Sequence, residues 1–474
     1  MLSSFLLVPL LFLIILNLPL KIMQKIAFWC AMLLVAGQAY LVLAHPAGFW
    51  DRTDDWANFF KLKLFADNLT YVLLLSIGIV VFTSLFVAWQ TIEEPKRRMN
   101  FVSLMLIALI GMNGTVLLTD IFSLYVFLEV TAVASFILIA FQCDLKALEG
   151  AFKYIILSAL ATMLILAAIA ALMLFSGDSS FASVSEAVKN NNGNVIIVSA
   201  IAVFLCGLFV KAGLVPFHAW LPDAHSAAPT AVSIFLSGVQ IKALGAYTII
   251  RLVTSVFGWT NSISNLLLLA GVVSIVIGAF GALAQHDFKR MLAYSSVSNM
   301  GYIILGFGCG SPIGIAGAIF HMFNHSVFKS LLFTNAAAVY NETHTTDMDQ
   351  MGGLGAKMPI SNATSLVGIL SAAGVPPTAG FWSKLIIIMA LWQGEHYVYV
   401  TVAILVAVLT LAYLLVIQRK VFFGILPEHL QNTKEAGIGI VLPAVILAAI
   451  IIGVGLFFPV MFNSFMIPID NFLK

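Results

Sequence analysis

Charged side chains are scarce in this sequence of 474 residues. Asp, Glu, Lys and Arg together make up 9% of the chain, whereas a soluble protein averages about 25%. Hydrophobic residues make up 61%, and apolar runs long enough to cross roughly 30 Å of hydrocarbon recur along the whole length. The composition leaves no room for a sizeable soluble domain and indicates a polytopic helical membrane protein. The net charge of +2 gives no sign of nucleic-acid binding.

Cysteine is rare as well. Cys30, Cys143, Cys206 and Cys309 are scattered and form no C-x-x-C pair. This spacing argues against an iron–sulfur cluster, a zinc site or a disulfide framework. No haem or flavin motif is present, so we expect no cofactor in this chain.

Fourteen apolar stretches are predicted to span the membrane: 2–20, 26–44, 64–90, 100–118, 121–142, 150–176, 195–221, 228–256, 263–284, 291–309, 312–338, 360–393, 399–418 and 436–463. The first is not expected to be a signal peptide, because Lys21 and Lys25 follow the apolar run instead of preceding it. Span seven contains Pro216, and span twelve contains Pro376-Pro377. Since proline lacks an amide donor and clashes with the preceding turn, both helices are predicted to be broken near the membrane midplane. Such breaks survive where they face protein or water.

The basic residues of the connecting loops predict the orientation of the chain. The odd-numbered connections hold twelve Lys and Arg residues, whereas the even-numbered connections and the tail hold six. Because basic loops stay in the cytoplasm, the odd connections are predicted to be cytoplasmic and both termini external.

The two broken spans resemble each other. Lys211-AGLVP in span seven and AGVPP-TAGFWS-Lys384 in span twelve each combine a break with one lysine. They lie five spans apart, and an odd repeat length turns the second copy upside down. Paired interrupted helices in two inverted halves are typical of transporters whose path lies near the midplane.

Ionisable residues inside the spans are the main functional signal: Lys153, Lys211, Lys242, Lys329, Lys384 and Glu129. Insertion scales put a lysine near a helix centre at roughly 2.5–3.5 kcal/mol, so such residues usually serve ion or proton movement. Glu129 and Lys211 are predicted to form a proton-binding pair, since an opposite charge favours the ionised carboxylate and burial opposes it. The alternatives are a protonated Glu129 that pins two helices, or a permanent structural ion pair.

A second group of ionisable residues lies in span eleven. His321, His325 and Lys329 fall at i, i+4 and i+8 and therefore share one helix face. Because histidine titrates near neutral pH, this face predicts a proton wire. The alternative is that neighbouring helices satisfy the histidines. A metal site is not expected, because no third soft or acidic ligand is nearby in sequence. Lys242, near the centre of span eight, and Lys384 complete the predicted line.

Two more residues are candidates for the line. His218 follows Pro216 directly after the first break. Lys153 lies near the cytoplasmic end of span six, where snorkelling to the interface is an alternative. Four other polar residues are expected to be interfacial and to cap helices or shape loops: Asp120, Asp223, His225 and Asp287.

Four segments resemble the motifs of one family, in the expected order: FVKAGLVPFHAWLPDAHSAAPTAVSIFLSGVQIKALGAY (209–247), ALAQHDFKRMLAYSSVSNMGY (282–302), HMFNHSVFKSLLF and AGVPPTAGFWSK. They look like the motifs of the antiporter-like subunits of respiratory complex I. The same fold recurs in energy-converting membrane-bound hydrogenases and in Mrp-type sodium/proton antiporters. The likeness covers at least residues 100–424.

The resemblance implies an all-α membrane fold of fourteen helices. Two inverted five-helix repeats, 100–256 and 257–424, are expected between an N-terminal three-helix segment, 1–99, and a C-terminal helix, 425–474. The resemblance also implies a proton path along the midplane. The residues that match the family's path are Glu129 of helix five, Lys211 of helix seven, Lys242 of helix eight, Lys384 of helix twelve and His321, His325 and Lys329 of helix eleven.

The resemblance further implies a proton-translocating subunit of a redox-driven complex in the prokaryotic cell membrane. The chain has no redox centre of its own, so redox cofactors are expected in its partners. These are other membrane subunits, including further antiporter-like subunits, and a peripheral redox module.

Two segments bear on the subfamily. HAWLPDAHSAAPT looks closer to complex I and hydrogenase subunits than to Mrp antiporters, whereas YVFLEVTAVASFIL looks nearer to hydrogenase and Mrp members. We therefore favour a hydrogenase-type or related complex. The alternatives are a subunit of an Mrp-type antiporter and a non-conducting scaffold. A quinone-reducing enzyme is disfavoured, because the chain holds no electron donor.

Overall fold

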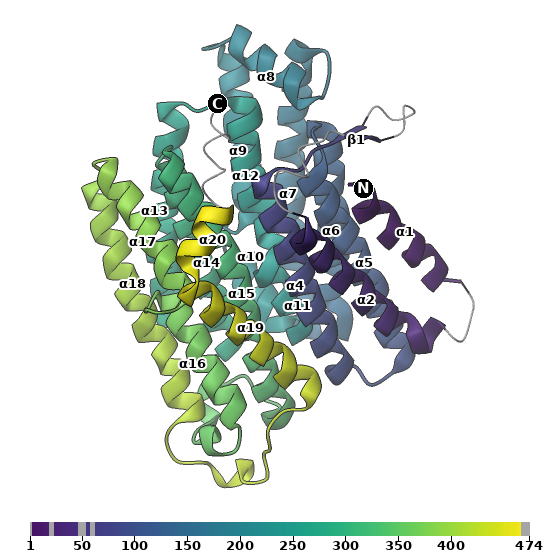
Figure 1. Ribbon diagram of the computed structural model, residues 1–474, viewed down its shortest axis with the longest axis vertical. Coiled ribbons are helices and arrows are strands. Elements are labelled where there is room, and N and C mark those ends of the chain that lie inside the picture. Colours follow the sequence, from purple (N-terminus) through teal and green to yellow (C-terminus); the bar gives the residue numbers. More distant parts are fainter. Residues whose placement is uncertain (1, 19–22, 46–53, 57–61, 466–474) are drawn as a thin grey trace.

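The computed structural model describes residues 2–18, 23–45, 54–56 and 62–465 (Figure 1). Ten helical stretches in this part of the chain are long and apolar enough to cross a membrane. They are α2 (Met23–Ala44), α4 (Asn68–Thr91), α5 (Pro95–Leu117), α6 (Ile121–Ile139) with η2 (Ala140–Gln142), α7 (Leu145–Ser176), α9 (Val195–Ala212), the segment Thr230–Phe257, α13 (Asn261–Leu283), α18 (Tyr397–Ile417) and α19 (Ile438–Leu456). The prediction of a polytopic helical membrane protein is confirmed.

The remaining long helices are shorter or more polar. They are α1 (Ser4–Leu16), α14 (Phe288–Gly308), α15 (Pro312–Thr343), α16 (Pro359–Ala373) and α17 (Ala379–Gln393). Two of them carry most of the predicted polar line, α15 with His321, His325 and Lys329 and α17 with Lys384. The count of fourteen spans therefore stays a prediction.

Two elements were not predicted from the sequence. A two-stranded antiparallel hairpin, β1 (Asp54–Trp56) and β2 (Leu62–Leu64), departs from the expected all-α fold. An additional helix, α8 (Phe181–Asn190), follows α7, with Phe181, Val184 and Val188 buried along one face. Predicted span fourteen, 436–463, is divided at Phe457 into α19 and a short helix, α20 (Phe458–Phe465). The other short segments are η6 (Met348–Gln350), η7 (Leu354–Ala356), η8 (Gln418–Phe422) and η9 (Glu428–Leu430).

Both predicted helix breaks are present. The first separates α9 from α10 (Trp220–Ala227), and the second separates α16 from α17. Gly213 (φ 64°) and Gly374 (φ 84°) end the preceding helices in the left-handed region, which glycine adopts without steric cost. Each break contains one cis peptide bond, Val215-Pro216 or Pro376-Pro377. The prolines lie at the surface of the chain, whereas Lys211 and Lys384 beside them are buried.

One capping arrangement occurs twice. Asp120 accepts a hydrogen bond from Ser123 N at the start of α6 and another from the hydroxyl of Ser179, which follows α7. Asp287 accepts from Arg290 N at the start of α14 and from the hydroxyl of Thr346, which follows α15. Backbone bridges Asp120–Ser180 and Asp287–Asp347 accompany the two caps. The prediction that both aspartates cap helices is confirmed.

The segment from Thr230 to Phe257 is wound irregularly. It contains α11 (Thr230–Phe235), α12 (Thr248–Leu252) and three π-helical stretches, η3 (Leu236–Gln240), η4 (Lys242–Tyr247) and η5 (Val253–Phe257). π turns are rare in helices and frequent at functional sites. A Cβ added at Gly245 would lie 2.4 Å from Ala212 Cα, so glycine permits this close approach to the end of α9.

Figure 1 shows which elements lie at one end and along the two sides of the bundle. The helix α8 and the hairpin strand β1 lie at one end, and α1 and α2 flank the bundle on one side while α17 and α18 flank it on the other. α13 packs on α14, which packs on α15, and α15 in turn contacts α17 and α19. α14 and α15 are buried along almost their whole length and form the centre of the molecule.

Candidate functional site

Glu129 and Lys211 form a direct ion pair between α6 and α9. The distance from Lys211 Nζ to Glu129 Oε1 is 2.7 Å. Lys211 also donates to Ser158 Oγ at 2.7 Å, and the Thr162 hydroxyl donates to the same Glu129 oxygen at 2.7 Å. The side chain of Lys211 is 0% exposed and that of Glu129 is 26% exposed. The predicted pairing is present, with α7 supplying two hydroxyl groups to it.

Lys242 is fully buried in the π-helical segment of span eight. Its ammonium group donates to the backbone carbonyl of Ser237 and to that of Gly238 at 2.8 Å. Both carbonyl groups belong to the π-helical stretch η3, which departs from regular α-helical winding. Within the described residues Lys242 makes no ion pair with a carboxylate.

Lys329 lies at the centre of the bundle on α15. It donates to Leu292 O and to Ser295 Oγ, each at 2.7 Å, on α14. The neighbouring Ser296 shares a hydrogen bond of 2.7 Å with Ser237, whose carbonyl accepts from Lys242. Serines of α14 therefore connect the surroundings of Lys242 with those of Lys329.

The two histidines of α15 continue from Lys329 towards α17. The rings of His325 and His321 are stacked with centroids 6.3 Å apart and planes at 12°. His321 Nδ1 lies 2.9 Å from Ser383 Oγ, next to Lys384 in the chain. Both ring nitrogens of His325 and Nε2 of His321 are buried without a hydrogen-bond partner in the described part of the chain. Buried polar atoms of this kind are normally paired with protein or water.

Lys384 lies directly after the second break. Its ammonium group donates to Ala372 O at 2.8 Å, at the carboxyl end of α16. The Tyr302 ring from α14 lies 4.5 Å from Lys384 Nζ, a cation–π contact. The carbonyl end of a helix carries partial negative charge and also favours a cation. The ammonium group of Lys384 therefore contacts neutral groups, whereas that of Lys211 is paired with a carboxylate.

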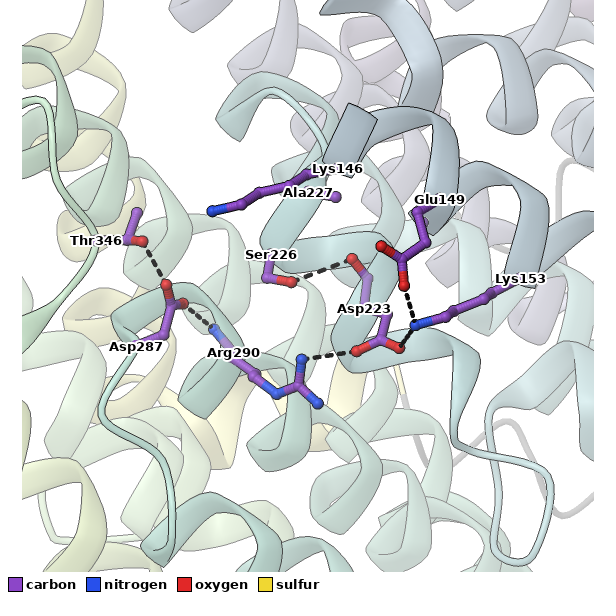
Figure 2. Close-up of a pocket in the computed structure, with 10 residues that line it drawn as sticks. Lys146, Glu149, Lys153, Asp223, Ser226, Ala227, Asp287, Arg290 and Thr346 are labelled. Carbon is purple, nitrogen blue, oxygen red and sulfur yellow. Dashed lines mark hydrogen bonds and ion pairs between the residues drawn. The ribbon is translucent and has the colours of Figure 1, made fainter. Parts of the chain in front are cut away.

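No hydrogen bond or ion pair in the described part of the chain connects the two weaker candidates to the other members of the line, so their role stays a prediction. His218 is half-buried and its ring lies 6.2 Å from that of Tyr294. Lys153 is 42% exposed and pairs with Glu149 at 2.7 Å and with Asp223 at 2.8 Å. Figure 2 shows Lys153, Glu149 and Asp223 in a polar pocket of about 310 Å³, where Arg290 also pairs with Asp223 at 2.7 Å.

His225 is a correction to the sequence prediction. We expected an interfacial residue, but both ring nitrogens are buried without a hydrogen-bond partner in the described part of the chain. Its ring stacks on Phe333 of α15 with centroids 5.1 Å apart. Leu221, Ala224 and His225 fall at i, i+3 and i+4, a spacing that indicates one buried face of α10. That spacing is the signal that the sequence prediction missed.

No group of three or more His, Cys, Asp or Glu side chains that would suit a metal ion occurs among the described residues.

Arg251 is a second correction. It is one of the six basic residues that the charge analysis assigns to the even-numbered connections and the tail, but it is buried in α12 and pairs with Asp67 at 2.6 Å.

A sequence profile described as "NADH:quinone oxidoreductase/Mrp antiporter, TM" matches residues 119–410. The chain belongs to this family. It is 32% identical over 406 residues to a Na(+)/H(+) antiporter subunit of Alkalihalophilus pseudofirmus, covering 85% of this chain and 81% of that protein. It is 30% identical over 377 residues to the "NADH-quinone oxidoreductase subunit N" of Desulforudis audaxviator, covering 79% and 75%.

Solved structures share the fold of this antiporter-like family member. A chain of the Mrp complex from a Dietzia species superposes with a TM-score of 0.89 at 22% identity and covers 100% of this chain and 97% of that one. A chain of an archaeal membrane-bound sulfane sulfur reductase superposes with a TM-score of 0.87 at 24% identity, covering 100% and 98%. Respiratory complex I from Thermus thermophilus gives 0.81 at 22% identity, covering 98% and 99%.

Proposed function

We propose that this chain is a proton-translocating subunit of a multi-subunit membrane complex. The observation that carries the proposal is the row of buried cations near the centre of the bundle. Lys211, Lys242, Lys329 and Lys384 are each at most 3% exposed. Charges buried in this way are costly and usually functional.

The polar side chains that lie between Lys242, Lys329 and Lys384 support a path for protons. Between Lys242 and Lys329 lie three serine hydroxyls, those of Ser237, Ser295 and Ser296. Between Lys329 and Lys384 lie two imidazole rings and one hydroxyl, those of His325, His321 and Ser383. Each of these six groups can exchange a proton or reorient its hydroxyl. Buried polar atoms such as these imidazole nitrogens are normally paired with protein or ordered water, and water bound there would extend the chain of proton-exchanging groups. His225 is an additional member, since its unpartnered ring faces the same helix as Lys329.

We also propose fourteen spans and two inverted five-helix repeats, 100–256 and 257–424. The duplicated caps at Asp120 and Asp287 support this proposal. The same type of helix break supports it too, because Gly213 and Gly374 end α9 and α16 in the same conformation.

The proposed direction runs from the cytoplasm to the outside, with both termini external. A proton enters towards Lys211, passes Lys242 and the face of Lys329, and leaves from Lys384. Cys143 offers a direct test of orientation, because it is exposed between α6 and α7 near the predicted cytoplasmic Lys146. An impermeant thiol reagent should label Cys143 in inside-out vesicles but not in intact cells, and Cys143→Ser should abolish that label.

The proposed complex is redox-driven, of the hydrogenase-type or a related class. Its partners are further antiporter-like membrane subunits and a peripheral module that carries the redox cofactors. The second candidate is a subunit of a sodium/proton antiporter, and the 32% identity to the Alkalihalophilus pseudofirmus antiporter protein favours it. Sodium-dependent transport without an electron donor would select the second candidate. A non-conducting scaffold is the remaining alternative.

Lys242→Gln tests the function. The variant keeps a side chain that donates to Ser237 and Gly238 but removes the exchangeable charge, so proton translocation in vesicles should fall by about tenfold or more. The exposed Lys146→Gln is the matched control and should translocate normally, because Figure 2 shows no hydrogen bond or ion pair from its side chain to the other residues drawn. Wild-type translocation in Lys242→Gln would support the scaffold alternative.

A further inference from the structure

An open groove lies on the outside of the bundle between α5, α6 and α7, away from the buried lysines. Its volume is about 950 Å³. Its walls are mainly hydrophobic side chains, exposed or half-buried, which include Leu104, Phe136, Ile137, Leu148, Phe152 and Ile155. All three helices are long and apolar enough to cross a membrane. The groove therefore faces lipid or a partner within the membrane.

A cation stands at one end of this groove. Arg97 lies in the first turn of α5 and is exposed. Its guanidinium donates to Phe141 O at 3.2 Å and lies 5.4 Å from the centroid of the Phe141 ring. A guanidinium has five N–H donors. This single hydrogen bond within the described part of the chain leaves donors for an anion at the mouth of the groove.

The acidic side chains near the mouth do not neutralise Arg97. Glu149 is the one carboxylate in the groove lining, and Figure 2 shows it turned towards Lys153, with which it pairs at 2.7 Å. Asp144 caps α7 by accepting from Ala147 N at 2.7 Å and does not line the groove. The groove thus presents one unpaired positive charge among the residues that the structure describes.

The length of the groove matches one leaflet of a bilayer. Its lining on α7 runs from Leu145 to Ile155, about 15 Å at 1.5 Å per residue. The hydrocarbon core is about 30 Å thick, so the groove ends near its middle. A transmembrane helix of a neighbouring subunit crosses the whole core, whereas the acyl chains of a lipid end at this depth. The dimensions favour a lipid.

We propose that this groove binds one phospholipid with an anionic headgroup. The phosphate lies against Arg97 at the level of the basic loops, and the acyl chains lie along α6 and α7. Basic residues between helices at a membrane surface recognise anionic headgroups in this way. The bound lipid braces α6 against α7, the helices that supply Glu129 and Ser158 to the ion pair with Lys211.

Cys143 is a native reporter of this site. It is exposed and lines the groove, and its Sγ lies 4.0 Å from Phe141 O, the carbonyl group that Arg97 also contacts. A headgroup on Arg97 therefore shields the thiol. The lipid exchanges, so the reaction of the thiol is slowed and not blocked.

The test is the rate at which N-ethylmaleimide alkylates Cys143 in the assembled complex in nanodiscs. The rate should be several-fold lower in discs that contain phosphatidylglycerol than in discs of phosphatidylcholine alone. An anionic surface also slows exposed thiols in general, because it disfavours the thiolate. Arg419→Cys supplies a reference thiol on another basic loop, since Arg419 is exposed and lies outside the groove lining. All rates are taken relative to this reference.

Two substitutions complete the test. Arg97→Gln should abolish the difference between the two lipids, and Arg97→Lys should keep most of it, because the positive charge remains. Equal relative rates of Cys143 in both lipids would overturn the proposal, as would a full difference in Arg97→Gln. Slow alkylation in both lipids that becomes fast only when the subunits are separated would assign the groove to a neighbouring subunit and overturn it too.

Discussion

The two lysines beside the helix breaks are buried to a similar degree but have different partners. Lys211 contacts a carboxylate, Glu129, at 2.7 Å and the hydroxyl of Ser158. Lys384 contacts the carbonyl group of Ala372 and the ring of Tyr302. A carboxylate stabilises an ammonium group far more than a carbonyl or a ring does in a dry environment. The first lysine is therefore suited to a lasting charge, and the second to gaining and losing its proton.

The caps allow the two halves to be compared position by position. Ser296 lies nine residues after Asp287, as Glu129 lies nine residues after Asp120. Counting back from the second bridge, Lys329 stands 18 residues before Asp347, as Thr162 stands 18 residues before Ser180. The acid Glu129 of the first half thus corresponds to the neutral Ser296 of the second half. The neutral Thr162 of the first half corresponds to the base Lys329 of the second half. Under the proposed function, this difference predicts that the first half holds charge and the second half passes protons.

The largest effect is expected from Lys384→Ala, which should reduce net proton translocation by about tenfold or more, because the variant loses the proposed proton carrier of the exit. Lys384→Glu should keep part of the activity, since a carboxyl group at that depth also exchanges protons. Pumping in inside-out vesicles measures both. Full activity in Lys384→Ala would place the exit elsewhere or show that this chain does not conduct.

A smaller but still large loss of proton translocation is expected for Glu129→Gln. The substitution leaves Lys211 buried without a counter-charge, while the amide oxygen can still accept from Thr162. The variant should insert and assemble but lose most translocation. Glu149→Gln is the matched control, since Glu149 contacts the partly exposed Lys153 at the pocket surface, and it should remain active. If Glu129→Gln and Glu149→Gln translocate protons equally well, the ion pair of Glu129 with Lys211 is not needed, and the contrast between Lys211 and Lys384 is lost.

A moderate effect is expected at Tyr302. A desolvated cation–π contact is worth about 2 kcal/mol, so Tyr302→Leu should slow translocation measurably. Tyr302→Phe keeps the ring over Lys384 and loses only the hydroxyl, which donates to Ala403 O at 2.6 Å. It should therefore be much closer to the wild type. If the phenylalanine variant is as impaired as the leucine variant, the hydroxyl matters and the ring contact does not.

The smallest effect is expected at a surface loop. Hydrogen bonds from Lys420 and from His286 lower the pKa of Asp349 below its usual 3.8. A carboxyl with a lowered folded-state pKa contributes stability above its unfolded pKa and loses it as the pH falls through the folded value. Asp349→Asn should therefore reduce the melting temperature slightly at neutral pH and not at pH values below the folded pKa. A difference that persists in acid would assign the effect to packing.

Much of this arrangement could be predicted from single segments of the sequence. Pro216 and Pro376-Pro377 marked the breaks, and the buried lysines and the spacing of His321, His325 and Lys329 marked the line. Apart from the Glu129–Lys211 pair, contacts between distant segments could not be predicted. Arg251 and Asp67 pair across 184 residues, and Tyr302 reaches Lys384 from another helix. His225 was expected to be interfacial and lies two residues after Asp223, but tertiary packing buries it against Phe333.

The most direct test of the difference between the halves is one substitution at two positions. Arginine keeps the positive charge but does not release its proton. Proton translocation should therefore survive substantially in Lys211→Arg, where the charge is paired, and be lost in Lys384→Arg, where the proton must leave. The two variants change side-chain size equally, so each controls for the other. Activity in Lys384→Arg, or its loss in Lys211→Arg alone, would contradict this account.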